Sequence, residues 1–169
     1  MAELQKNKPA AQPGGPTVLD NLRLALRDEA ERRRFHVRLN VRGGLPAQSY
    51  RLEFDMAGSG EVQSQYADAL SKREGRTDKA ALDSRQVLAI LKTLAPALEL
   101  ADEQPRFLPD TLVGTLEISD GTNTHRIYFA ADPDQAKAQG KSLPPALQAA
   151  VNSIYAAAAK LLGQRSVKP

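Results

Sequence analysis

The sequence predicts an α+β fold, with an antiparallel sheet of about five strands, two helices on one face of it and an extra N-terminal helix. Two segments, 35–42 and 50–56, alternate apolar and polar residues as strands do when one face is buried. A third alternating stretch, 112–129, surrounds a short turn, and a proline-started amphipathic segment follows it. We expect a disordered tail at 1–16, an amphipathic helix at 17–34, a single α+β domain at 35–163 and a disordered tail at 164–169.

Leucines at helical spacing predict the N-terminal helix. Residues 1–16 are rich in Lys, Gln, Ala, Pro and Gly, so they bury too little apolar area to order themselves. Thr17 or Asp20 can cap a helix in which Leu19, Leu22 and Leu26 form one stripe. This apolar stripe must be buried, either against the sheet or against a second copy of the chain in a two-fold dimer.

Alternation predicts the first strands. The first strand has four apolar residues on one face: Phe35, Val37, Leu39 and Val41. Gly43 and Gly44 end it, and the second strand follows at 50–56. Gly58–Gly60 predicts a turn into a third strand at 61–66, which we expect at an edge because it has few apolar residues. We expect the charged segment 68–80 to be a mobile loop or a weak continuation of this hairpin.

Capping signals predict the remaining elements. Asp83 and Gln86 have capping-box spacing, and Pro96 should end that helix near Ala95. A long connection leads to a hairpin that turns at Asp120-Gly121. We expect a loop at 132–140, and then a last helix that starts at Pro144-Pro145.

Composition excludes several classes of site and location. The 169 residues contain no cysteine, which removes disulfides, thiolate nucleophiles and Cys-ligated metals. No apolar run approaches the length of a membrane span, and the N-terminus has no signal-like apolar region, so we expect a cytoplasmic protein without membrane association.

The residues that carry chemistry are few. The only histidines are His36 and His125, and neither has a second ligand at metal-binding spacing. Glu53 and Asp55 share a strand face, where acids usually keep a strand soluble. We therefore expect no catalytic, cofactor-binding or metal-binding residues, no cofactor and no enzymatic activity. The alternative is an enzyme in which carboxylates meet one of the two histidines.

Charge is unevenly distributed. Residues 1–42 hold nine Lys and Arg against five acids, whereas the whole chain has a net charge of +3. This favours, as an alternative function, binding of nucleic acid or an acidic partner through the segment Arg32–Arg42. The polar face of the first strand (His36, Arg38, Asn40 and Arg42) has no aromatic residue for base stacking, which argues against nucleic acid.

Several short motifs occur in a recognisable order. They are Arg42-Gly43-Gly44, Leu82-Asp83-Ser84-Arg85-Gln86, Phe107-Leu108-Pro109, the Leu112–Phe129 hairpin and Leu143-Pro144-Pro145-Ala146-Leu147. Over residues 35–162 the chain resembles the emfourin-like proteins, small bacterial proteins named for a protein inhibitor of thermolysin-type metalloproteases. The resemblance implies a non-enzymatic protein-binding domain, with a thermolysin-type metalloprotease as its partner and inhibition as its activity.

For such a binding module we expect the partner to be contacted by one set of residues: Arg38, Arg42, Gly43, Gly44, Arg106 and Phe107. The loops that could enter a protease cleft are 43–49, 58–60 and 103–110. The sequence also allows a domain whose partner it does not reveal.

Overall fold

A computed structural model describes residues 15–43, 50–68, 73–100, 107, 111–138, 140 and 142–161. They form an α+β fold around one six-stranded antiparallel sheet, with strand order β4-β3-β2-β1-β5-β6. The strands are β1 (His36–Gly43), β2 (Tyr50–Ala57), β3 (Glu61–Asp68), β4 (Arg73–Ala81), β5 (Val113–Ser119) and β6 (Thr124–Ala130).

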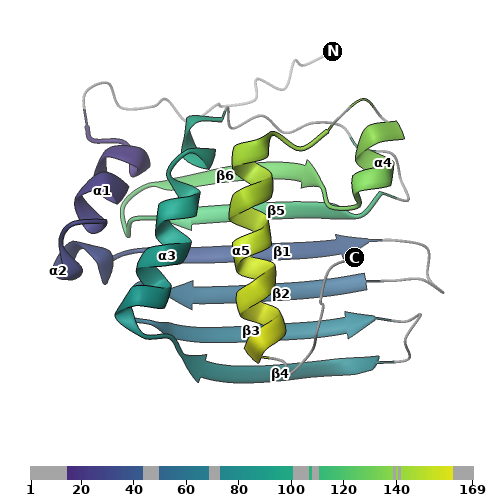
Figure 1. Ribbon diagram of the computed structural model, residues 1–169, viewed down its shortest axis with the longest axis horizontal. Helices are drawn as coiled ribbons and strands as arrows, with labels where there is room; N and C mark the ends of the chain where they lie inside the picture. The colour runs from purple at the N-terminus through teal and green to yellow at the C-terminus, as the bar shows by residue number, and fades with distance from the viewer. Residues whose placement is uncertain are drawn as a thin grey trace, which may run out of the picture.

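Helices cover one face of this sheet. They are α1 (Val18–Ala25), α2 (Glu29–Arg32), α3 (Ser84–Leu94), α4 (Pro133–Ala138) and α5 (Pro145–Leu161), with a 3-10 turn at Ala97–Glu99. α3 and α5 cross the strands side by side, and α1 and α2 lie at one end of the same layer (Figure 1). Among the described residues no helix lies over the opposite face of the sheet, which we call the open face.

The core lies between the sheet and this helical layer. Leu39 on β1, Phe54 on β2 and Leu116 on β5 are fully buried, as the alternation of apolar residues predicts. α3 contributes Leu91 and α5 contributes Ile154 to the same cluster. Because β1, β2, β3, β5 and β6 send alternate residues into this core, the intervening polar residues of these strands must point to the open face.

β4 corrects two expectations. Of the two alternatives for the segment 68–80, the continuation of the hairpin is right and the loop is wrong, because the segment contains the nine-residue strand β4, which pairs with β3. β3, predicted at an edge, lies between β2 and β4. β4 has a sequence of charged and small residues, which gives no apolar alternation. It forms because its backbone pairs with β3, and charge on an outermost strand discourages further pairing.

The N-terminal helix is two helices. Asp28 has an extended backbone, and its side chain accepts a hydrogen bond from the Ala30 amide at 2.8 Å, so it caps a new helix. Leu22 is fully buried in the chain's own core, and Leu19 and Leu26 pack against that core. The stripe expected to need a cover is therefore covered within the molecule, and the dimer proposed through these leucines has no exposed Leu22 to use.

The ends of the helices were predicted more accurately than the edge strand and the number of N-terminal helices. Thr17 and Asp83 each form both halves of a capping box, with Asp20 and Gln86 respectively. α3 ends at Leu94, two residues before Pro96, and α5 begins at Pro145. The loop expected at 132–140 contains the short helix α4 instead, whose first turn is capped by the Asp132 carboxylate.

None of the helices in the described ranges is both long and apolar enough to span a membrane.

Candidate functional site

The open face carries a row of charged and polar side chains in strand register. From edge to edge the row is Lys79, Gln63, Asp55, Arg38, Glu117 and Arg126, one residue from each strand. Opposite charges alternate over its last four members, and cross-strand pairs of this kind stabilise a sheet modestly. The strands thus bring together six side chains that lie up to 88 positions apart in the chain.

Ion pairs connect this row. Arg38 donates to Oδ2 of Asp55 from Nε and Nη2, both at 3.0 Å. Arg126 Nε donates to Glu117 Oε2 at 2.6 Å, and Arg38 Nη1 lies 3.9 Å from Glu117 Oε1. Because these side chains are 24–53% exposed, each pair contributes little stability, at most about 1 kcal/mol. Their main effect is to hold the charged groups in fixed positions on a flat surface.

His36 joins the same network. Its Nε2 lies 2.6 Å from Oδ1 of Asp55, so one carboxylate contacts both His36 and Arg38. The imidazole is 39% exposed. The structure therefore brings one histidine and one acid together, as the enzyme alternative requires, although on an exposed surface.

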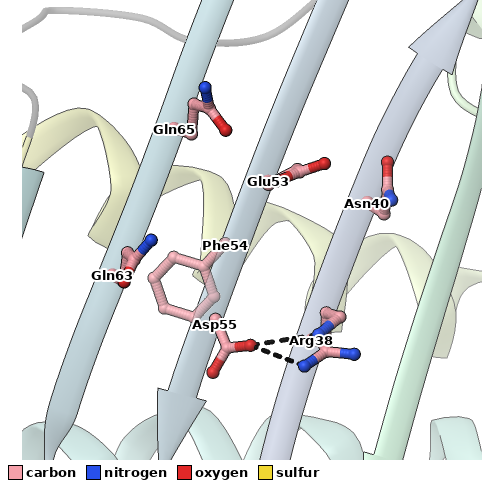
Figure 2. Close-up of a pocket in the computed structure, with 7 residues that line it drawn as sticks. All are labelled: Arg38, Asn40, Glu53, Phe54, Asp55, Gln63 and Gln65. Atoms are coloured by element: carbon pink, nitrogen blue, oxygen red, sulfur yellow. Dashed lines mark hydrogen bonds and ion pairs between the residues drawn. The ribbon is translucent and has the colours of Figure 1, made fainter. Parts of the chain in front are cut away.

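A shallow polar depression of about 430 Å³ lies beside this network. Figure 2 shows its lining: Arg38, Asn40, Glu53, Phe54, Asp55, Gln63 and Gln65. Oδ1 of Asn40 is buried and has no hydrogen-bond partner in the described part of the chain. The amides of Gln63 and Gln65 also make no hydrogen bond with described residues. The Gln63 and Gln65 amides are therefore open to a ligand. Asn40 Oδ1 is a buried acceptor without a donor, which is costly.

Arg42 stands next to this depression. It pairs in register with Arg51 on β2, and both arginines are exposed. Arg51 donates to Oε1 of Glu53, with Nη2 at 2.7 Å, whereas Arg42 makes no ion pair or hydrogen bond with any described residue.

The predicted contact residues are only partly placed. Arg38 and Arg42 share the open face, and Gly43 ends β1 with φ of 137°. A Cβ on Gly43 would lie 2.6 Å from the backbone oxygen of Thr111, so the chain that follows 103–110 meets the end of β1. Phe107 is half-buried, and Gly44 and Arg106 lie outside the described residues.

Of the predicted loops, 58–60 does not project. Gly58 and Gly60 are buried, and the Gly58 amide donates to the Phe35 carbonyl at 2.7 Å. The Leu82 amide donates to the Gly60 carbonyl at 2.8 Å. This tight turn is fixed between α2 and α3, which leaves it no reach into a protease cleft. The other two loops lie mostly outside the described residues.

The basic segment Arg32–Arg42 is largely neutralised. Arg32 is buried, with hydrogen bonds to the Ala25 carbonyl and the Ser84 hydroxyl. Arg33 pairs with Glu29 and Arg34 with Glu31, while Arg38 pairs with Asp55. Arg42 alone among the arginines of this segment is unpaired within the described residues. In the described strands the one aromatic side chain on the open face is Tyr128. It belongs to β6, two strands away from β1.

Features elsewhere are separate from this surface. His125 lies on the helix-covered side of β6, where its buried Nε2 has no partner among the described residues. An apolar groove of about 670 Å³ runs between α3 and α5 beside the end of β4. In the described ranges, no three His, Asp or Glu side chains lie close enough to hold a metal ion.

Sequence reasoning missed several open-face residues. Gln63, Gln65, Glu117 and Arg126 were not singled out, although each alternates with buried residues. Their period-two spacing could have placed each of them on the open face of its own strand. The sequence does not give the strand order that brings these residues together.

No protein-family model matches the chain, and no curated protein matches it. The resemblance to the emfourin-like proteins therefore remains a prediction from the motifs.

Proposed function

We propose that this protein is a non-enzymatic binding module that contacts a partner protein through the open face of its sheet. The observation that carries the proposal is the polar depression around Asn40, where a buried acceptor and two free amides adjoin fixed ion pairs. Such a surface presents many directional groups without an apolar patch, as the polar parts of transient interfaces do.

The size of the face suits this role. Six strands about 4.8 Å apart and about seven residues long give a face on the order of 600 Å². A standard protein–protein interface buries about 800 Å² on each partner, so the face and its adjoining loops would suffice. The depression of about 430 Å³ has room for a side chain or two from the partner.

The partner we propose is a thermolysin-type metalloprotease, because the motifs resemble those of the emfourin-like proteins. The described residues favour a role for the β1 end in this contact, since Gly43, where the predicted loop 43–49 begins, lies against Thr111, which directly follows the predicted loop 103–110. Nucleic-acid binding through Arg32–Arg42 is less well supported, because Arg32 is buried and three more arginines are paired.

Titration of thermolysin tests the inhibitor function. Hydrolysis of a small peptide substrate should slow when the protein is added in micromolar excess. Unchanged hydrolysis would contradict the proposed partner.

Matched variants test the surface. Asn40→Lys places a cation in the depression, and Asn152→Lys places the same charge on an exposed position of α5. We expect Asn40→Lys to weaken inhibition at least tenfold, which is about 1.4 kcal/mol, and Asn152→Lys to leave it unchanged. Equal effects of the two variants would contradict binding through the open face.

A further inference from the structure

The arginines of the open face differ in how they are neutralised. Arg38, Arg51 and Arg126 each contact a carboxylate of their own face at 3.0 Å or less. Arg42 does not contact any carboxylate of the described residues, and its register partner on β2 is another arginine. Like charges directly opposite each other on neighbouring strands destabilise a sheet. Arg42 is therefore the arginine of the described open face whose positive charge the sheet itself does not balance.

The surroundings indicate what would balance it. The next residue of β1 on the same face is Asn40, whose Oδ1 is buried without a donor in the described part of the chain. Residues two apart on a strand are about 6.8 Å apart. A ligand that spans the two positions would bring an anionic group to Arg42 and Arg51. Its hydrogen-bond donor would meet the amide of Asn40, which lines the depression and must turn to expose its Oδ1. An extended peptide with an acidic side chain has both, because its backbone N–H groups are donors.

We propose that Arg42 and Arg51 bind a carboxylate of an acidic side chain on the partner, beside an N–H donated to Asn40. The inference rests on the proposed function, since it names the chemistry of the partner at that same face. Guanidinium groups bind carboxylates with two parallel hydrogen bonds, and two adjacent guanidiniums can share one carboxylate. Glu53 holds Arg51 in place for this contact through its Oε1.

The same face disfavours a polyanion such as nucleic acid. Glu53 and Asp55 lie on β2 beside the arginines, and Glu117 lies on β5. A single carboxylate shared by Arg42 and Arg51 would approach only Glu53, whereas a run of phosphates would meet all three acids. The observations therefore favour an acidic peptide.

Side-chain NMR with a capped pentapeptide that carries one central glutamate (acetyl-Ala-Ala-Glu-Ala-Ala-amide) tests the site directly, at low ionic strength. We expect saturable shifts of the Arg42 and Arg51 Nε–Hε signals and no shift of Arg33, which is exposed and paired with Glu29. Arg42→Gln should weaken peptide binding about tenfold, as expected for the loss of charge-assisted hydrogen bonds. Arg33→Gln, which removes the same charge elsewhere, should change it less than twofold.

Three outcomes would overturn the inference. They are the absence of a saturable shift, equal weakening by Arg42→Gln and Arg33→Gln, and tighter Arg42-dependent binding of a single-stranded oligonucleotide than of the peptide. Thermal melting of both variants shows that each is folded, and we expect Arg42→Gln to melt no lower than the parent because it removes the like-charge pair. If thermolysin inhibition depends on Asn40 while the single-glutamate peptide does not bind, the inference fails and the proposed function stands.

Discussion

Asn21 donates a hydrogen bond from Nδ2 to Oδ2 of Asp120 over 2.7 Å, and this contact joins α1 to the turn between β5 and β6. The other oxygen of Asp120 accepts from the amides of Thr122 and Asn123, at 2.8 and 2.7 Å. One buried carboxylate thus fixes both the turn and the N-terminal helix, 99 residues away in sequence.

Asp120 should make stability depend on pH. Burial alone raises the pKa of Asp120, but hydrogen bonds from Asn123, Asn21 and Thr122 outweigh it and lower the pKa below 3.8. A lowered pKa stabilises the fold above the unfolded-state value, and this contribution is lost as pH falls through the folded-state pKa. Asp120→Asn should therefore cost about 1–3 kcal/mol at pH 7, and the difference should shrink below pH 3.8. Urea unfolding of the parent and of Asp120→Asn at pH 7 and pH 3 measures this difference in unfolding free energy. The same difference at both pH values would contradict the stabilising role of the Asp120 carboxylate.

Arg32 should be a structural rather than a binding residue. It is buried, and its Nε and Nη1 donate to the Ala25 carbonyl and the Ser84 hydroxyl. Arg32→Met should destabilise the protein by about 1–3 kcal/mol, because both acceptors lose their donor. Arg33→Met, on the exposed neighbour, should cost less than about 1 kcal/mol. Denaturant unfolding compares the two, and equal effects would show that Arg32 has no special role.

Gly114 should tolerate no side chain. Its partner across the β5–β6 pair is Phe129, whose ring occupies the space that a Cβ on residue 114 would need. Gly114→Ala should cost about 1–3 kcal/mol through overpacking, and Phe129→Leu should recover part of the loss in the double variant. Gly15→Ala is the control, since nothing lies within 4 Å of its Cβ position. Thermal melting that places Gly114→Ala level with the control would refute this packing.

Alternation and capping made most of the fold predictable. β1 and β2 have apolar residues at every second position, and Asp83 and Pro145 carry recognisable start signals. β4 was predicted only as one of two alternatives, because an edge strand can be held by backbone pairing and needs little apolar surface of its own. α2 was merged with α1 because Asp28 reads equally well as a polar residue of a continuing helix.

The candidate site was predictable only within single strands. Arg38 and Arg42 could be assigned to one face of β1, but their neighbours depend on which strands pair and in which register. Asp55 belongs to the next strand in sequence, whereas Glu117 lies 79 residues beyond Arg38 and is its direct partner. No local pattern in the sequence contains that pairing.

Protection of single introduced cysteines tests the central claim, that the open face is the binding surface. The chain has no cysteine, so Gln63→Cys on the open face and Asn152→Cys on α5 each give one reactive thiol. Labelling rates are measured with and without excess thermolysin. We predict that thermolysin slows labelling at position 63 at least tenfold and leaves position 152 unchanged. Protection at 152 with full reactivity at 63 would contradict the account.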